Sequence, residues 1–247
     1  YQHKNLKEIT FKDLWGDKGM FTTMWIFGKP AKILFFKKHI ENLIKSLTVY
    51  KLNKPNLENN ILKLIKMNIK KNKKYNHLLR VAVNNKIISV SLRRRLNPKL
   101  KFNLKLVNYS RNKPEFKNLK YQVILKYLSK MDSTTSDIGL CNNGKISESG
   151  TSNILFIKKD YIFSPINKIY KGITFKFFEN KLGKIIKKDI LIKSLQEYDE
   201  IILVGSGKGV TSVNTINDIK WKRKNLKFYK ILSNFYKTEI NKCSIYR

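Results

Sequence analysis

The spacing of apolar residues in the first half of the chain alternates between that of strands and that of helices. Residues 20–27 (MFTTMWIF) are rich in aromatic and β-prone side chains, end at Gly28-Lys29-Pro30 and resume at residues 33–36, which predicts a hairpin. Apolar residues then recur at helical spacing, which predicts helices at residues 37–47 and 57–69. The same β-prone pattern predicts further strands at residues 78–83, 87–92 and 102–107.

The second half begins after a polar stretch that contains Pro114. We therefore predict an N-terminal α/β lobe at residues 1–110, a linker at 111–116 and a C-terminal lobe at 117–247. A short helix pattern around Val123–Leu128 precedes a predicted β-meander, whose strands are expected at residues 137–142, 146–148, 153–157 and 161–163.

Four further signals complete this half. Gly172 opens a predicted helix, a buried strand at residues 200–204 leads into the glycine-rich turn at 205–209, and residues 226–240 form the predicted closing helix. Strands paired by hairpins with helices packed outside them favour an α+β fold with two lobes.

Composition narrows the class of protein. An apolar fraction of 42%, with 12% aromatic residues in 247, is too high for a disordered chain despite a formal charge of +35. Such a charge suggests nucleic acid as a partner. However, only seven of the 52 basic residues are Arg, the residue that phosphate and base recognition favours, and the lysines are spread almost evenly. We therefore do not expect nucleic-acid binding to be the main function.

The rarer residue types exclude other classes. Two cysteines and three scattered histidines form neither a disulfide framework nor a zinc site, so no metal is predicted. No apolar run approaches the roughly eighteen residues of a membrane span, and the N-terminus lacks the apolar core of a signal peptide. We expect a reduced, cytoplasmic protein without membrane association.

Four short segments, taken together in their order along the chain, point to a particular chemistry. They are Gly19-Met20-Phe21-Thr22-Thr23, His39-Ile40-Glu41-Asn42-Leu43, residues 144–153 (GKISESGTSN) and Gly172-Ile173-Thr174. In order and rough spacing they resemble the fold-type IV pyridoxal-phosphate enzymes, the class IV aminotransferase family. The resemblance covers nearly the whole chain, and residues 148–153 are its most specific piece. It implies the two-lobed fold of the D-amino-acid aminotransferases, pyridoxal 5'-phosphate as cofactor and a homodimer.

Such a cofactor needs a lysine between the lobes to bind its aldehyde and later to move the substrate proton. The resemblance places this lysine shortly after the linker, which makes Lys120 the candidate. Lys126 is the alternative, because Leu125-Lys126-Tyr127-Leu128 resembles the same segment. The interval from Lys120 to Glu148 is several residues shorter than is usual in the family, so we expect a truncated helix there.

The other cofactor contacts follow from the same resemblance. Glu148 corresponds to the carboxylate that keeps the pyridine nitrogen protonated, so that the ring accepts electrons. Without the resemblance, Glu148 could be a solvent-facing strand residue, but the small polar residues that follow it are unfavourable in a strand. The amides of Ile173 and Thr174, at a helix N-terminus, and the hydroxyl of Ser206 are expected to bind the phosphate.

Two positions depart from the family pattern. Asn42 and Phe175 stand where the family usually has arginines, one of which grips the phosphate. Losing a charge-assisted hydrogen bond costs on the order of 1.5 to 3 kcal/mol, which leaves a degenerate, inactive relative as an alternative.

Two details bear on the reaction. Thr22-Thr23 after Phe21 resembles the lyase of this family, in which such a threonine lies over the cofactor, and we take both threonines as substrate-binding candidates. The loop at residues 205–210 also differs from the Gly-Thr-Ala series of branched-chain enzymes. The resemblance thus implies conversion of 4-amino-4-deoxychorismate to 4-aminobenzoate and pyruvate, on the route to folate. A branched-chain or D-amino-acid aminotransferase is the alternative.

Overall fold

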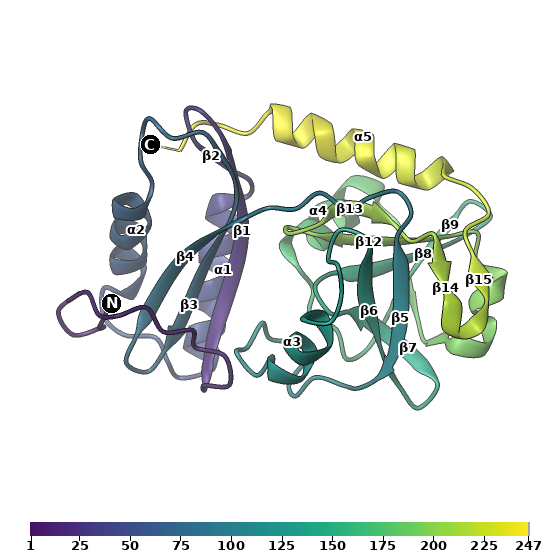
Figure 1. Cartoon of the computed structure of the whole chain (residues 1–247), viewed down its shortest axis with the longest axis horizontal. Helices are drawn as coiled ribbons and strands as arrows, with labels where there is room; N and C mark the ends of the chain where they lie inside the picture. The colour runs from purple at the N-terminus through teal and green to yellow at the C-terminus, as the bar shows by residue number, and fades with distance from the viewer. Residues whose placement is uncertain (247) are drawn as a thin grey trace. The chain divides into compact units, whose positions relative to one another are not determined.

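The computed structural model describes residues 1–246 and divides the chain into two compact units (Figure 1). The N-terminal unit comprises residues 1–95 and 116–122 and the chain from Lys242 onward; the C-terminal unit comprises residues 96–115 and 123–241. The chain passes between the two units after residues 95, 115, 122 and 241, and one of these crossings lies within the predicted linker at 111–116. Residues 103–108 form a strand that pairs with residues 136–141, and this pairing draws residues 96–110 into the C-terminal unit.

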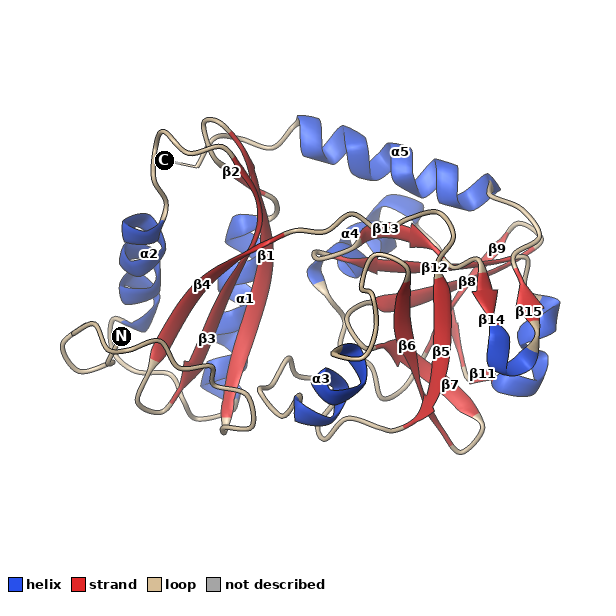
Figure 2. Cartoon of the chain, viewed as in Figure 1, coloured by secondary structure: helices blue, strands red, loops and turns tan. Residues whose placement is uncertain are grey.

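The N-terminal unit is an antiparallel four-stranded sheet with two helices (Figure 2). Its elements are β1 (Gly19–Gly28), β2 (Lys32–Ile33), α1 (Phe36–Val49), α2 (Leu57–Asn68), β3 (Tyr75–Asn84) and β4 (Ile88–Arg94), with strand order β2-β1-β3-β4. Apolar residues of both helices share one core with Met24, Leu79 and Val81 of the sheet. Helical spacing of apolar residues therefore located both helices correctly.

One predicted element is shorter than expected. The second strand of the first hairpin ends at Ile33 rather than Phe36, and α1 begins where the strand was expected to finish. Phe35 has a left-handed backbone (φ 56°), which ends the extended conformation one residue before the helix.

The C-terminal unit contains two sheets. The first has the order β11-β7-β6-β5-β14-β15 and the second β10-β9-β8-β12-β13. The strands are β5 (Asn103–Asn108), β6 (Ser136–Asn142), β7 (Lys145–Ser149), β8 (Asn153–Lys158), β9 (Tyr161–Pro165), β10 (Ile186–Lys188), β11 (Ile190–Leu191), β12 (Glu200–Gly205), β13 (Gly209–Ser212), β14 (Thr215–Ile216) and β15 (Trp221–Lys222).

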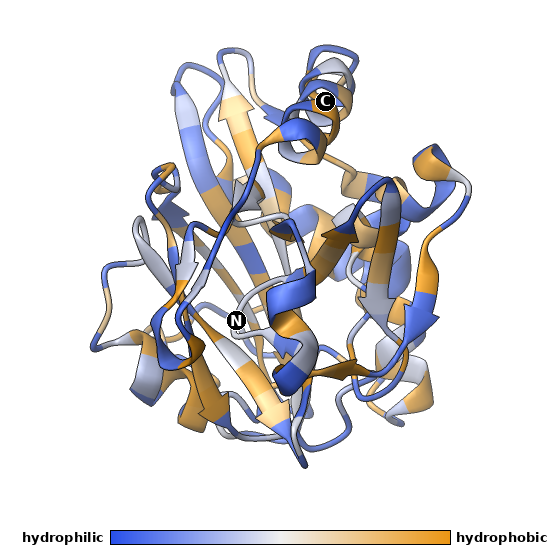
Figure 3. Ribbon diagram, turned by 90° about the vertical axis from the view of Figure 1, so that its right-hand side faces the viewer, coloured by the Kyte–Doolittle hydropathy of each residue, from blue (hydrophilic) through white to orange (hydrophobic). Residues whose placement is uncertain are grey.

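Helices complete this unit. They are α3 (Gln122–Leu128), α4 (Ile173–Leu182), α5 (Lys227–Asn241) and the short 3-10 helices η1 (Ile192–Glu197) and η2 (Asn217–Ile219). The seven residues of α3 agree with the truncated helix expected after Lys120. Apolar residues of the two sheets, among them Leu104, Ile146, Phe156 and Leu203, form one core. In Figure 3 apolar residues lie along the strands, whereas most loops are hydrophilic.

The predicted β-meander is wrong as a single sheet. β6 and β7 pair in the first sheet, whereas β8 and β9 pair in the second. The chain changes sheets at residues 150–152, where the Gly150 amide donates to the Ile138 carbonyl (2.8 Å) and the Ser149 amide to the Ser152 carbonyl (2.9 Å). This turn carries the most specific piece of the family pattern, so these candidate site residues lie where the chain passes from one sheet to the other.

Candidate active site

Glu148, the fourth residue of β7, has its carboxylate buried against a guanidinium. Arg111 Nε donates to Glu148 Oε1 at 2.6 Å, and the two side chains are 2% and 6% exposed. Arg111 also donates through Nη2 to the Pro114 carbonyl (2.6 Å). Since an isolated buried charge is strongly unfavourable, each group supplies the counter-charge that the other needs.

The carboxylate also contacts the segment that leads into α4. The Tyr170 amide donates to Glu148 Oε2 at 3.3 Å. A carboxylate accepts up to about four hydrogen bonds, so pairing with Arg111 does not in itself exclude a further donor, such as a protonated ring nitrogen. Sequence reasoning did not identify Arg111 as a site residue. The feature that could have identified it is that arginine is rare in this chain, in which most basic residues are lysines.

The turn after Glu148 is held by a buried aspartate. Asp137 Oδ2 accepts hydrogen bonds from Ser149 Oγ (3.1 Å) and Thr151 Oγ1 (2.7 Å). Gly150 is required here, because a Cβ at this position would lie 2.8 Å from the Ile138 side chain. The hydroxyl groups of this turn therefore stabilise its backbone in addition to any role in binding.

Asn153 fixes the start of α4. Its Nδ2 donates to the Tyr170 carbonyl (2.6 Å), and its Oδ1 accepts the Gly172 amide (3.1 Å). Gly172 is the N-cap of α4, as predicted, and it provides no side-chain hydrogen bond to the first turn. The amides of Ile173 and Thr174 are thus in the helix position that favours anions.

The start of α4 meets the loop between β12 and β13. Thr174 Oγ1 and Ser206 Oγ lie 3.4 Å apart although they are 32 residues apart in the sequence. Gly205 packs on Ser152, whose Oγ is buried and has no hydrogen-bond partner among the described residues. Three hydroxyl groups from different segments therefore gather beside a helix N-terminus. Glu148, Ile173, Thr174 and Ser206 all belong to the C-terminal unit.

The substrate candidates of the N-terminal unit lie on opposite faces of β1. Thr22 is buried toward α1, with its Oγ1 2.8 Å from His39 Nδ1. Burial, and after it the charge of Lys117, lowers the pKa of His39 to about 3, so this imidazole is neutral at pH 7. Thr23 is half-buried on the other face.

Thr23 is part of a polar row across the sheet. It pairs with Arg80 of β3, which pairs with Ser91 of β4, and paired residues of adjacent strands share a face. The Arg80 guanidinium lies 2.7 Å from Asp13 Oδ1 and 4.5 Å from the ring centroid of Trp15. Sequence reasoning missed Arg80, because the position of its side chain depends on strand register.

Lys120 belongs to a segment that runs along β1. The Phe21 amide donates to the Lys117 carbonyl (2.9 Å), and the Leu119 amide donates to the Gly19 carbonyl (3.0 Å). The Lys120 side chain is exposed, and its Nζ donates to the Gly16 carbonyl. Lys126 is exposed in α3 and belongs to the C-terminal unit. The choice between the two lysines stays a prediction.

The donor set of the C-terminal unit fits pyridoxal phosphate. The unpartnered Ser152 hydroxyl and the adjacent Thr174 and Ser206 hydroxyls suit a phosphate group, and so does the uncapped first turn of α4. Glu148 suits a protonated pyridine nitrogen. Phe175, where the family usually has an arginine, is fully buried, with Lys187 Nζ 4.2 Å from its ring centroid.

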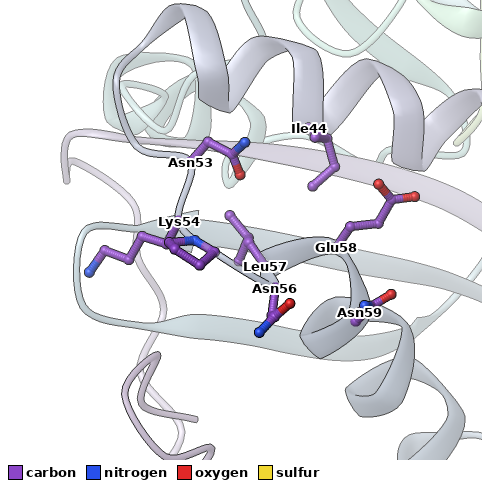
Figure 4. Close-up of a pocket in the computed structure, with 8 residues that line it drawn as sticks. Ile44, Asn53, Lys54, Asn56, Leu57, Glu58 and Asn59 are labelled. Atoms are coloured by element: carbon purple, nitrogen blue, oxygen red, sulfur yellow. The ribbon is translucent and has the colours of Figure 1, made fainter.

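The N-terminal unit has a hollow between α1 and the start of α2, shown in Figure 4. It is lined by Ile44, Asn53, Lys54, Pro55, Asn56, Leu57, Glu58 and Asn59. None of the predicted site residues lines it.

Comparisons with known proteins agree with this geometry. The family model described as amino-transferase class IV matches residues 19–216. No curated protein matches the chain. The solved branched-chain aminotransferase of Thermoproteus uzoniensis is 17% identical, with a TM-score of 0.73 over 89% of this chain and 84% of that one. That of Thermobaculum terrenum, in its PLP form, is 14% identical, with a TM-score of 0.72 over 93% and 88%.

A lyase is equally similar. The putative 4-amino-4-deoxychorismate lyase of Legionella pneumophila is 16% identical, with a TM-score of 0.72 over 93% of this chain and 96% of that one. The predicted α+β fold is confirmed. Because the family model spans most of the sequence, the chain belongs to the class IV aminotransferases, which are pyridoxal-phosphate-dependent enzymes.

Proposed function

We propose that this enzyme is a lyase that converts 4-amino-4-deoxychorismate to 4-aminobenzoate and pyruvate in folate biosynthesis. The observation that carries the proposal is the row formed by Thr23, Arg80 and Ser91. The substrate has two carboxylates, and Arg80 is flanked by hydroxyl groups. One of its N–H groups donates to Asp13, and a guanidinium carries five N–H donors, so in this proposal the others bind a substrate carboxylate.

Each unit has a separate task in this proposal. When bound, pyridoxal phosphate supplies an aldehyde that captures the substrate amine and a ring that takes up an electron pair. Glu148 holds a proton on the ring nitrogen, and Arg111 holds Glu148 in place. The amides of Ile173 and Thr174 and the Ser206 hydroxyl bind the phosphate.

The N-terminal unit handles the substrate in this proposal. Lys120 binds the aldehyde at rest and then removes the proton from the amine-bearing carbon of the substrate. Thr23 and Arg80 orient the substrate through its carboxylates, while Thr22 stays bonded to His39. Loss of the enolpyruvyl group as pyruvate makes the six-membered ring of the substrate aromatic, which drives the reaction forward.

A class IV aminotransferase acting on branched-chain or D-amino acids is the second candidate. It would use the same residues up to proton removal and would then return the proton to a different carbon. The TM-scores of 0.73 and 0.72 against a branched-chain aminotransferase and a lyase favour neither reaction.

The test is a direct assay of the protein purified with pyridoxal phosphate. We expect a yellow protein that releases 4-aminobenzoate and pyruvate in equal amounts. Faster transamination of leucine or D-alanine would overturn the lyase assignment. A protein that stays colourless even with added cofactor and shows no turnover would identify a degenerate family member, as the Asn42 and Phe175 positions allow.

We also expect a cytoplasmic homodimer. The expectation rests on the family resemblance, and light scattering of the purified protein tests the dimer. No helix in residues 1–246 combines the length and apolar character needed to cross a membrane.

A further inference from the structure

Lys208 is unusual among the lysines of this chain because its side chain is buried. It is 9% exposed and lies in the three-residue loop Ser206–Lys208, which joins β12 to β13 where Gly205 pairs with Gly209. Its Nζ donates to the Ser133 carbonyl (3.1 Å) and lies 5.0 Å from the ring centroid of Phe102. The side chain therefore anchors the loop to the interior of the C-terminal unit.

The charge of Lys208 faces a fully buried carboxylate. Its Nζ is 3.9 Å from Asp137 Oδ2, and Asp137 is 0% exposed. The same Oδ2 accepts the Ser149 and Thr151 hydroxyls, while Oδ1 accepts the Ile138 amide (2.8 Å). A carboxylate buried in this way needs a nearby opposite charge.

The pair connects two segments of the candidate site that are distant in the sequence. Asp137 holds the turn that follows Glu148, and Lys208 is the last residue of the loop that carries Ser206. Where the two segments meet, a Cβ at Gly205 would lie 2.8 Å from Ser152 Oγ, so their backbones are closely packed. Movement of the loop would change the Thr174–Ser206 separation of 3.4 Å.

We propose that Lys208 and Asp137 are positioning residues, whose charge pair sets the distance between the Ser206 loop and the turn after Glu148 so that the cofactor's phosphate is bound. The proposal rests on the cofactor of the family and does not depend on which reaction the enzyme catalyses. Neither residue needs to touch the cofactor, since each acts through the segment it holds.

The test compares binding of pyridoxal phosphate with binding of pyridoxal, which lacks the phosphate. Lys208→Met keeps an unbranched apolar side chain and removes the charge that lies over the Phe102 ring. We expect its Kd for pyridoxal phosphate, measured by absorbance titration, to rise about tenfold, while the Kd for pyridoxal changes less than twofold. Asp137→Asn should give the same selective loss, and the double variant should lose little more than either single variant, because the two residues act as a pair.

Lys224→Met is the matched control. Lys224 Nζ lies 3.2 Å from Asp199 Oδ1 in the same unit, so this variant also breaks an ion pair but should leave both Kd values unchanged. Equal losses for the two ligands in Lys208→Met, or no loss for either, would overturn the proposal. If Lys208→Met does not fold, the same criterion applied to Asp137→Asn decides. If the wild-type enzyme turns over substrate normally and the Lys208 and Asp137 variants bind pyridoxal phosphate as tightly as wild type, this inference is refuted. The proposed function is then unaffected.

Discussion

The two units hold their candidate residues by different means. In the C-terminal unit the phosphate and ring contacts lie in turns and loops, fixed by side-chain bonds such as Arg111–Glu148 and Asn153–Tyr170. In the N-terminal unit, Thr23 and the Lys120 segment are placed by backbone pairing along β1. Single side-chain substitutions should therefore weaken cofactor binding by the C-terminal unit more readily than they displace the substrate-binding residues of the N-terminal unit.

The largest effect is expected from breaking the buried pair in the C-terminal unit. Arg111→Met leaves Glu148 buried without its counter-charge, which should lower the free energy of unfolding by about 3 to 5 kcal/mol. Urea denaturation measures this. Arg111→Met/Glu148→Met should regain part of the stability because no charge is then stranded, whereas equal stability of all three proteins would contradict the role given to the pair.

The next effect belongs to the N-terminal unit and depends on pH. Because the pKa of His39 is about 3 in the folded protein and about 6.5 unfolded, only the unfolded chain takes up this proton between those values. Stability should therefore fall as the pH drops below 6.5, by up to about 1.4 kcal/mol per pH unit. His39→Gln should remove this slope in thermal unfolding curves, while substitution of the half-buried His77 of β3 by Gln should keep it.

A smaller effect should separate the two threonines of β1. Thr22→Val leaves the buried His39 without its hydroxyl partner and should cost about 1 to 3 kcal/mol of stability. Thr23→Val should leave the unfolding midpoint unchanged and raise KM severalfold. The comparison fails if Thr23→Val destabilises the protein as much as Thr22→Val does.

The smallest effect is expected at the phosphate contacts. Thr174→Val and Ser206→Ala each remove one hydroxyl expected to donate to the phosphate. A water molecule can take the place of the lost hydroxyl, so we expect a net loss of only about 0.5 to 1.5 kcal/mol and a roughly two- to tenfold rise in the Kd for pyridoxal phosphate. Ser194→Ala removes a hydroxyl bonded to the Leu191 carbonyl in the same unit and serves as the control. A larger rise in the control variant would argue against these contacts.

Local patterns were sufficient for most elements and for the contiguous motifs. Apolar periodicity predicted α1 and α2, and glycine marked the start of α4 at Gly172. Periodicity failed where pairing is long-range: β5 pairs in parallel with β6, and β7 and β8 lie in different sheets. No local signal reports which strand a segment will join.

The candidate site shows the same limit. Glu148, Thr174 and Ser206 could be proposed from the motifs that contain them, whereas Arg111 and Asp137 act through partners 37 and 12 residues away. Lys208 could not be distinguished by composition in a chain of 52 basic residues. Its burial became visible only once the fold placed Asp137 beside it.

The central claim is that Lys120 binds the cofactor. Borohydride reduces the bond between a lysine and pyridoxal phosphate to a stable one, so digestion and mass spectrometry then identify the labelled residue. We predict a single labelled peptide modified at Lys120, with no label in Lys120→Ala and full label in Lys126→Ala. Label at Lys126 or another lysine, or no label in wild type, would contradict the claim.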